Sequence, residues 1–333
     1  MSEKLRWALL STARINNALI NALRQAKRSA LVAVASRDLA RGQAYAQEKG
    51  IPQVYGSYEA LLADPAIDVI YISLPNALHA EWTIKAAEAG KHVLCEKPLV
   101  TSIEELNRVE AATIVHGVTV FEAFMYLHHP QTFKVKEMIQ AGRLGHLQLI
   151  NSWFNFYLPA VDAQNVRLSP NLVGGSAWDV GVYPNSLSIV MSGGTAPIEV
   201  WADQIPGESG IDVAMRAQLK FANRVVAQVS SGFRTAFRQA AYLVGDEGTL
   251  YLPEPWKPGE AGQDSQIFFS AFDGSEEILT VPAISPYLCE VEAMEACLLD
   301  GAAPVVPLSL SREFLRSMLA TYESAQSGQV VKL

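Results

Sequence analysis

Residues 5–24 read LRWALLSTARINNALINALR, and this stretch decides how the first third of the chain folds. Its apolar start, LRWALL, is followed by a turn of small residues and then by a segment with helical spacing, which predicts a strand, a turn and a helix. Dinucleotide-binding turns carry G-x-G-x-x-G, yet the three glycine positions here hold Ser11, Ala13 and Asn16. The stretch is either a cofactor turn built without glycine or an ordinary strand–turn–helix unit.

A turn without glycine can still bind an anion, because the N-terminus of the following helix presents N–H groups and the positive end of its dipole. Ser11 and Ala13 are small alternatives to glycine, and Ser11 adds a hydroxyl group. Asn16 is bulkier and is expected to hold the helix slightly off the strand. A cofactor bound here would contact the turn residues Ser11, Thr12, Ala13, Arg14 and Ile15.

The rest of the first third alternates short apolar runs rich in β-branched residues with helix-like segments. This alternation predicts right-handed βαβ units and a parallel sheet covered on both faces. Ser102 with Glu105 forms a capping box that starts the last of these helices. Ligands of such sheets bind outside the carboxyl ends of the strands. We therefore expect one crevice lined by the turns after Leu10, Ala35, Leu74 and Cys95.

From about residue 124 the pattern changes to consecutive strands with short connections, which predicts a largely antiparallel sheet. Two helical segments close the chain, and the polar stretch PEPWKPGEAGQDS (253–265) is predicted to be a surface loop. The predicted domains are 1–123 and 124–333. The fold class is therefore α/β, and its first domain holds a doubly wound parallel sheet.

Composition excludes several classes of protein. The 333 residues are half apolar and carry a formal net charge of −8, which argues against a nucleic-acid partner. No apolar run approaches the roughly 18 residues of a membrane span. The start MSEKLRW lacks the features of a signal peptide, so we predict a cytoplasmic protein with no membrane partner.

Motifs for metal binding and hydrolysis are missing from the sequence. The six histidines show no metal-ligand spacing, so no metal is predicted, and the pair His128–His129 is expected to be structural. The three cysteines lack C-x-x-C spacing. There is also no G-x-S-x-G elbow and no phosphate-binding G-x-x-x-x-G-K-[ST] loop.

The end of the second apolar strand, VAVASRD, bears on the choice of cofactor. NAD sites carry an acidic residue at this point, bonded to the ribose 2′-hydroxyl. Here Ser36 and Arg37 offer a hydroxyl and a guanidinium, which suit a 2′-phosphate. Alternatively, Arg37 is a solvated charge and Asp38 caps the next helix. Both interpretations stay open on residue type alone.

Two further segments carry groups suited to chemistry. GKHVLCEKPL places Glu96 and Lys97 at the mouth of a strand, where the restricted Lys-Pro step would direct the lysine into the crevice. GGSAWDVGVYPNS (174–186) places Asp179 and Tyr183 four residues apart, on one face of a helix. The alternatives are a surface lysine and a half-buried core tyrosine.

Together these segments resemble a known family. LPNALHAEWTIKAAEAGKHVLCEKPLV (74–100) resembles the signature of the Gfo/Idh/MocA oxidoreductases, the glucose–fructose oxidoreductase and inositol dehydrogenase family. GGSAWDVGVYPNS is similar to the family's D-x-G-x-[HY] segment in its tyrosine form, which is typical of the dimeric dihydrodiol dehydrogenase and NADP-dependent D-xylose dehydrogenase branch. FEAFMY, HHPQ, NVRLSP and LVGDEGTLYL extend the resemblance through nearly the whole chain.

The resemblance implies a Rossmann domain followed by an α/β domain with an open, mostly antiparallel sheet that serves in homodimer or tetramer contacts. It implies that Lys97, Asp179 and Tyr183 are catalytic, and that Ser36 and Arg37 bind the phosphate of NADP, with NAD the less expected cofactor. The glycine-free turn departs from the family pattern, as does Leu127, which stands where related chains often carry arginine. Further cofactor contacts are predicted at Leu74, Pro75, Asn76, His79, Glu96 and Lys97.

This set of residues suggests a hydride-transfer mechanism on a carbinol or carbonyl of a sugar, polyol or cyclic diol. A nicotinamide accepts the hydride, and a positioned base must accept the hydroxyl proton. Tyr183 is predicted to be that acid/base, because a lysine ammonium within about 4–6 Å lowers a phenol pKa from about 10. Asp179 would orient one or both groups. The rival assignment makes Lys97 the proton carrier.

The substrate pocket is less clearly marked in the sequence. SWFNFY alternates, so Trp153 shares a face with Asn155 and Tyr157, and this aromatic face suits either a polyhydroxylated small molecule or core packing. Arg167 is predicted either to bind substrate oxygens or to form a surface ion pair. Two alternatives to a dehydrogenase stay open: a redox-cycling enzyme of the same family with tightly bound cofactor, and a non-catalytic NADP-sensing regulator.

Overall fold

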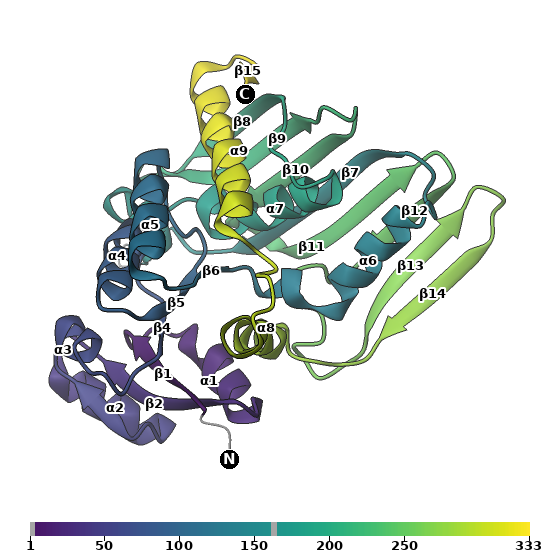
Figure 1. Ribbon diagram of the computed structural model, residues 1–333. Coiled ribbons are helices and arrows are strands. Elements are labelled where there is room, and N and C mark those ends of the chain that lie inside the picture. The colour runs from purple at the N-terminus through teal and green to yellow at the C-terminus, as the bar shows by residue number, and fades with distance from the viewer. Residues whose placement is uncertain (1–3, 161–164) are drawn as a thin grey trace. The chain divides into compact units, whose positions relative to one another are not determined.

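The computed structural model describes residues 4–160 and 165–333 (Figure 1). The chain forms two compact units. Unit 1 comprises Met1–Met125 and Tyr287–Leu308, and unit 2 comprises Tyr126–Pro286 and Ser309–Leu333. Unit 1 is therefore discontinuous in sequence, because a segment near the C-terminus packs with the N-terminal residues.

Unit 1 contains a six-stranded sheet in the order β3-β2-β1-β4-β5-β6, with every neighbouring pair parallel. This confirms the predicted doubly wound sheet. The strand order reverses between β1 and β4, and ligands of such sheets bind outside the carboxyl ends at that reversal. The strands are β1 (Leu5–Leu10), β2 (Ser29–Ala35), β3 (Gln53–Tyr55), β4 (Val69–Ile72), β5 (His92–Glu96) and β6 (Val120–Ala123).

One helix of unit 1, α5, begins where a local signal in the sequence predicts. Ser102 Oγ accepts the N–H of Glu105 at 3.2 Å, so the capping box begins α5 as expected. The Glu105 carboxylate accepts the N–H of Thr101 at 2.9 Å. α5 ends at Gly117, which is left-handed with φ 63°. The helices are α1 (Asn16–Gln25), α2 (Leu39–Lys49), α3 (Tyr58–Leu62), α4 (His79–Glu88), α5 (Ile103–His116) and α8 (Pro286–Asp300), with a 3-10 turn at Asn76–Leu78.

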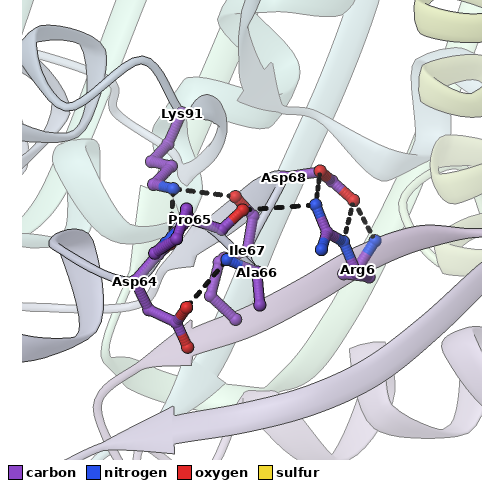
Figure 2. Close-up of polar contacts among 7 residues, drawn as sticks. All are labelled: Arg6, Asp64, Pro65, Ala66, Ile67, Asp68 and Lys91. Carbon is purple, nitrogen blue, oxygen red and sulfur yellow. Dashed lines mark hydrogen bonds and ion pairs between the residues drawn. The ribbon is translucent and has the colours of Figure 1, made fainter.

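Polar contacts join the residues at the amino ends of β1, β4 and β5, as Figure 2 shows. Arg6 Nη2 and Nε donate to the two carboxylate oxygens of Asp68 at 2.7 and 2.9 Å. Lys91 Nζ donates to the backbone carbonyls of Asp64 and Ile67 at 2.6 and 2.9 Å, and burial lowers the pKa of this lysine. The cluster lies at the edge opposite the carboxyl ends, so we assign it a structural role.

Unit 2 contains a nine-stranded sheet in the order β14-β13-β12-β11-β7-β10-β9-β8-β15. Only the β7–β10 pair is parallel among the described neighbours, so the sheet is mostly antiparallel, as predicted. Its strands are β7 (Leu147–Tyr157), β8 (Glu199–Pro206), β9 (Asp212–Lys220), β10 (Val226–Gly232), β11 (Arg234–Gly245), β12 (Gly248–Leu252), β13 (Ser265–Ala271), β14 (Glu276–Val281) and β15 (Val331–Lys332).

Three helices cover one face of this sheet: α6 (Pro130–Gln140), α7 (Val182–Met191) and α9 (Leu308–Ser327) (Figure 1). Along β7 the side chains of Ile150, Ser152 and Phe154 are buried and alternate with less buried neighbours. The even positions therefore face the helices, and the odd positions form the outer face. Shorter turns comprise 3-10 segments at Met125–His128, Val166–Leu168 and Pro170–Leu172, and a π-helix at Ala177–Gly181. In the described ranges, no helix has both the length and the apolar character to cross a bilayer.

The loop between β12 and β13 differs from the prediction of a surface loop, because Pro255, Trp256, Pro258 and Gly259 are buried. Trp256 is 0% exposed, and its ring lies 6.2 Å from that of Phe154 in a stacked arrangement. Its indole N–H donates to the carbonyl of Trp153 at 3.1 Å. The large apolar ring gains from burial and its polar group is satisfied, so the loop adds an aromatic residue to the core of unit 2.

His129 caps the first turn of α6. Its Nδ1 accepts the N–H of Gln131 at 3.0 Å, which requires an unprotonated nitrogen, and the side chain is 0% exposed. Burial lowers the pKa of His129 from 6.5 to about 4, and it lowers the pKa of His128 to about 4 as well. His129 therefore has the structural role expected for this pair.

This cap predicts a loss of stability in acid. The pKa of His129 is lower in the folded than in the unfolded protein. Its contribution to the free energy of unfolding is therefore present above pH 6.5 and is lost as the pH falls toward 4. A shift of this size is worth about 3 kcal/mol at pH 4. His129→Asn keeps an N-cap but cannot titrate, so we expect its free energy of unfolding to fall less between pH 7 and pH 4 than that of the wild type.

Urea unfolding at each pH measures this difference, with His116→Asn on the exposed end of α5 as the matched control. A pH dependence that is unchanged in His129→Asn would contradict the assignment.

Candidate active site

The turn after β1 is held by side chains where the fingerprint would use glycine. Ser11 has a φ of 135°, a conformation that glycine adopts more readily. The Ser73 hydroxyl donates to Asn16 Oδ1 at 2.6 Å, so the Ser11 hydroxyl donates to Ser73 Oγ at 2.8 Å. Ser11 Oγ also accepts the N–H of Ala13 at 3.1 Å. The Ser11 hydroxyl thus supports the turn, and its contact with a cofactor stays a prediction.

Asn16 completes this arrangement. It is 0% exposed, and its Nδ2 donates to the Ser11 carbonyl at 2.9 Å. The side chain that was expected to push the helix off the strand instead joins the turn to the end of β4 through Ser73. A hydrogen-bonded triad of Ser11, Asn16 and Ser73 therefore takes the place of the glycines.

The N-terminus of α1 fits an anionic group. Its N-cap residue, Ile15, makes no side-chain capping bond, and the first turn carries no acidic residue. Backbone N–H groups at such an end bind phosphate, and the helix dipole favours the negative charge. Arg14 is exposed beside them, while Thr12 and Ala13 are half-buried. These residues suit the pyrophosphate of a dinucleotide.

The carboxyl end of β2 presents a cation with its neighbours already engaged. Asp38 Oδ1 accepts the N–H of Arg41 at 3.1 Å, so this carboxylate caps α2, as one of the two interpretations of this segment proposed. Ser36 is 5% exposed, and Arg37 is exposed beside it. Burial raises the pKa of Tyr58, and the Arg37 and Arg41 guanidinium groups beside its hydroxyl oppose that rise. The guanidinium groups suit a phosphate better than a ribose hydroxyl.

The loops after β4 and β5 are tied together by His79. This residue is 1% exposed, and its Nδ1 and Nε2 lie 2.7 Å from the carbonyl oxygens of Pro98 and Leu74. Burial lowers the pKa of His79, and the two carbonyls oppose the shift. With both nitrogens engaged inside the protein, His79 positions the loops. The side chains left half-buried along them are Leu74, Pro75, Asn76, Glu96 and Lys97.

Lys97 directly follows the last residue of β5. The peptide bond from Lys97 to Pro98 is cis. Glu96 accepts a hydrogen bond from the Tyr71 hydroxyl at 2.5 Å, which fixes this carboxylate beside the strand. Because the carboxyl ends of parallel strands share one edge, Lys97 lies at the same edge as the triad and Arg37.

In unit 2, Tyr183 lies on α7 directly after the π-helical turn that carries Asp179. The segment was expected to be an ordinary helix, and the wider π turn is a finding of the structure. Tyr183 is 6% exposed, and its ring centre lies 5.5 Å from that of Phe154 and 5.9 Å from that of Trp256. An aromatic wall therefore surrounds the phenol.

Asp179 forms an ion pair with Arg167, whose Nε donates to Asp179 Oδ2 at 2.7 Å. The Arg167 side chain is 45% exposed, so of its two predicted roles the ion pair is the observed one. The backbone packs closely here: Gly175 N–H donates to the Arg167 carbonyl at 2.9 Å, and a Cβ at Gly174 would lie 2.4 Å from that oxygen. Glycine is required at Gly174 for this approach.

The structure corrects the assignment of Trp153 to the substrate. Trp153 occupies an odd position of β7 and stacks on Tyr242 at 6.2 Å, on the outer face of the sheet. Tyr183 contacts Phe154, the next residue, on the opposite face. Successive side chains of a strand point to opposite faces, so Trp153 is not retained as a substrate residue and Phe154 takes its place beside Tyr183.

Sequence reasoning missed several residues of the site. Ser73 was overlooked because it ends an apolar strand and matches no motif. Arg41 lies four residues after Arg37, and that spacing could have marked it as a second cation. Tyr58 and Phe154 carry no sequence signal, because each joins the site only through packing between separate elements.

Comparisons with known proteins agree with this arrangement. Residues 5–124 match the family described as an oxidoreductase family with an NAD-binding Rossmann fold, and residues 132–251 match the GFO/IDH/MocA C-terminal domain. The chain is 38% identical over 328 residues to the D-xylose 1-dehydrogenase (NADP(+)) 2 of Haloferax volcanii, covering 98% of this chain and 99% of that relative. It is 31% identical over 257 residues to a trans-1,2-dihydrobenzene-1,2-diol dehydrogenase of Danio rerio, covering 76% of each.

Solved structures share the fold over nearly the whole length. A 3-ketoreductase from Actinomadura kijaniata, in complex with NADP and TDP-benzene, superposes with a TM-score of 0.89 at 26% identity and covers 97% of this chain and 98% of its own. An aldose-aldose oxidoreductase from Caulobacter crescentus shares the fold with a TM-score of 0.90, over 99% of this chain and 100% of its own, at 23% identity. The motifs, both sheets and these matches show that the chain belongs to the Gfo/Idh/MocA oxidoreductase family.

Proposed function

We propose that the protein is an NADP(H)-dependent oxidoreductase that interconverts a carbinol and a carbonyl on a sugar, polyol or cyclic diol. The observation that carries this proposal is a group of residues in unit 2, Asp179, Tyr183 and Arg167, which we call the half-site. There a π-helical turn and α7 present Asp179 and Tyr183 beside an aromatic wall, with Arg167 paired to the aspartate. The family and the named activities of the dehydrogenase relatives support it.

The cofactor choice rests on the end of β2. Arg37, which directly follows Ser36, and Arg41 offer two guanidinium groups near Tyr58, and the carboxylate of Asp38 is engaged as a helix cap. NADP differs from NAD by a phosphate on the ribose, and guanidinium groups bind phosphate through charge-assisted hydrogen bonds. The first relative named above is NADP(+)-dependent. The triad and the α1 N-terminus would hold the pyrophosphate.

The residues divide the chemistry between them. When bound, the nicotinamide supplies hydride transfer. Tyr183 moves the proton of the substrate hydroxyl, and the Lys97 ammonium donates a hydrogen bond to the same oxygen and favours the phenolate. Asp179, oriented by Arg167, positions the substrate and Tyr183.

A substrate panel tests this function. Aldoses, polyols, dihydrodiols and dicarbonyls are each offered with NADP(H) and NAD(H), and nicotinamide absorbance is followed. We expect turnover on at least one sugar, polyol or diol, with NADP(H) preferred. If NADPH binds but no compound in the panel changes the absorbance in either direction, the protein is a nucleotide-sensing regulator and the proposal fails. Cofactor that copurifies and turns over without release would instead identify the redox-cycling alternative.

The triad predicts how the glycine-free turn contributes to cofactor binding. Asn16→Ala leaves the Ser11 carbonyl and the Ser73 hydroxyl without their partner, and such loss costs about 1–3 kcal/mol. We therefore expect the Kd for NADPH to rise by about tenfold. Fluorescence titration measures it, and Asn17→Ala, an exposed neighbour on the same helix, is the matched control. Equal affinities of the two variants would show that the turn does not depend on the triad.

We also propose that a second copy of the chain covers the outer face of the nine-stranded sheet. An aromatic row crosses this face: Tyr242 stacks on Tyr251 at 4.5 Å, Tyr251 lies 5.7 Å from Phe268, and Trp153 stacks on Tyr242. Tyr242 is 37% exposed, and apolar rings in such a patch mark an interface.

Light scattering at micromolar concentration tests this interface. We expect a dimer or larger assembly for the wild type, and we expect Tyr242→Glu to shift it toward the monomer. Phe272→Glu, at an exposed hairpin end, is the control. A wild type that is monomeric in this measurement would refute the proposal.

A further inference from the structure

Asp212 is the most buried acidic group near the half-site of unit 2 that the proposed chemistry does not use. It is the first residue of β9 and is 3% exposed. Its Oδ2 accepts the Ser176 hydroxyl at 2.7 Å and the Ala177 N–H at 2.8 Å, while its Oδ1 accepts the Tyr322 hydroxyl at 2.7 Å. Three donors from two separate segments thus converge on one carboxylate.

Two of these donors belong to the start of the π-helical turn. Ala177 is its first residue, and Ser176 directly precedes it. The third donor, Tyr322, comes from α9, and its ring stacks on Trp178 at 5.4 Å. Asp212 therefore links the turn to the sheet on one side and to α9 on the other.

The backbone near the Asp212 carboxylate leaves room for it because glycine lies at the point of closest approach. Gly175 has a φ of 122°, and a Cβ there would lie 2.2 Å from Asp212 Oδ1. At the other end of the turn, a Cβ at Gly181 would lie 2.9 Å from Ser231 Oγ, and that hydroxyl lies 3.2 Å from Ser176 Oγ. Gly175 thus makes room for the Asp212 carboxylate, and Gly181 makes room for the Ser231 hydroxyl beside Ser176.

The π turn matters because it carries Asp179 and leads directly into α7, which carries Tyr183. A π turn contains one residue more than an α turn, and π turns are rare, single-turn features that need support from their surroundings. If the turn relaxed to α geometry, the residues before it would rotate by about 100° around the helix axis. The position of Asp179 relative to α7 would then change, while Tyr183 would stay against Phe154.

We propose that Asp212 is a positioning residue whose carboxylate holds the π-helical turn that carries Asp179 in its observed geometry, directly before the helix that carries Tyr183. This inference rests on the proposed function, because it assigns Asp212 an effect on the same reaction. Asp212 acts through the turn and contacts neither substrate nor cofactor. Tyr322 is its partner, and the Ser176 hydroxyl and the Ala177 amide are the groups that it holds.

Asp212→Asn tests the proposal, because the amide has the same shape but cannot accept from both sides. We expect kcat to fall by about tenfold or more, since small displacements of reacting groups have large effects, while the KM for NADPH stays within about twofold. Tyr322→Phe removes one of the three donors and is expected to lower kcat less. Asp203→Asn, which lies on a surface ion pair with Arg216 in the neighbouring strand, is the matched control and is expected to match the wild type.

Hydrogen exchange of the backbone amides supplies a readout that does not depend on turnover. We expect exchange at 177–183 to be faster in Asp212→Asn, with the rest of unit 2 unchanged. If Asp212→Asn does not fold, the double variant Ser176→Ala, Tyr322→Phe carries the same two measurements.

The two readouts separate this inference from the function on which it rests. If the wild type shows no turnover, but Asp212→Asn shows faster exchange confined to 177–183, then Asp212 does hold the π turn and the proposed function is wrong. If Asp212→Asn folds and has the kcat and the exchange rates of the wild type, the positioning role of Asp212 is refuted. Equal losses in kcat and NADPH affinity, with exchange raised throughout unit 2, also overturn it, because they indicate general loosening.

Discussion

Tyr183→Phe is expected to lower kcat by about a thousandfold, because general acid–base catalysis contributes about 10²–10⁴ to the rate. The substitution removes one oxygen and keeps the ring against Phe154 and Trp256, so the aromatic wall and the fold should persist. The KM for NADPH should change little, since the phenol moves a proton of the substrate. Steady-state kinetics on the substrate found with the panel measure both kcat and the KM for NADPH.

Lys97→Met distinguishes the two assignments of the proton carrier. If Tyr183 is the acid/base and Lys97 its electrostatic partner, Lys97→Met should retain slow turnover. The limb of the pH–rate profile that reports the phenol pKa should shift to higher pH, because the phenol loses the nearby positive charge. Tyr183→Phe should have no such limb. Tyr157→Phe, at an exposed ring on the same sheet, is the control. Near-normal turnover of Tyr183→Phe would make Lys97 the proton carrier and Tyr183 a positioning residue.

Arg37→Ala is expected to raise the KM for NADP by about a hundredfold and to leave the KM for NAD nearly unchanged. A hydrogen bond to a charged group is worth about 1.5–3 kcal/mol, and each 1.4 kcal/mol corresponds to about tenfold in affinity. The loss should fall on NADP alone, because only that cofactor carries the ribose phosphate. The preference between the two cofactors should therefore shrink or reverse.

The comparison of kcat/KM for the two cofactors measures this effect. Arg24→Ala removes an exposed arginine at the other end of α1, where it donates to the Lys49 carbonyl, and is the matched control. Arg41→Ala is expected to show a smaller effect in the same direction, since its guanidinium lies beside the same tyrosine. An unchanged cofactor preference in Arg37→Ala would mean that the guanidinium is only a solvated surface charge.

Much of the fold was predictable because its signals are local. The alternation of apolar runs and helical segments identified the parallel sheet of unit 1, and the capping box located the start of α5. The change of pattern near residue 124 identified the mostly antiparallel sheet. The loop residue Trp256 escaped prediction, because a polar, glycine-rich stretch carries no sign that one ring will fill a gap in a distant core.

The candidate site was predictable only in part. Lys97, Asp179, Tyr183, Ser36 and Arg37 were named from motifs, and the structure places each on the element expected for it or directly after that element. The role of Trp153 was left open between substrate binding and core packing, because alternation along a strand shows which residues share a face but not which face meets the site. The contact between Phe154 and Tyr183 shows which face of β7 meets Tyr183, and alternation then places Trp153 on the other face.

By itself, the sequence determined the order of strands and helices, the class of both sheets, the lysine and tyrosine of the family motifs, and the absence of the glycine fingerprint. These properties depend on residues close together in the chain, whose spacing selects backbone conformation directly. Only the tertiary structure decided how Ser11, Asn16 and Ser73 replace the glycines, how His79 joins two loops, and how Asp212 and Tyr322 hold the π turn. Each of these arrangements joins groups that lie far apart in the chain, and their hydrogen bonds form only where packing of the core has already brought the partners together.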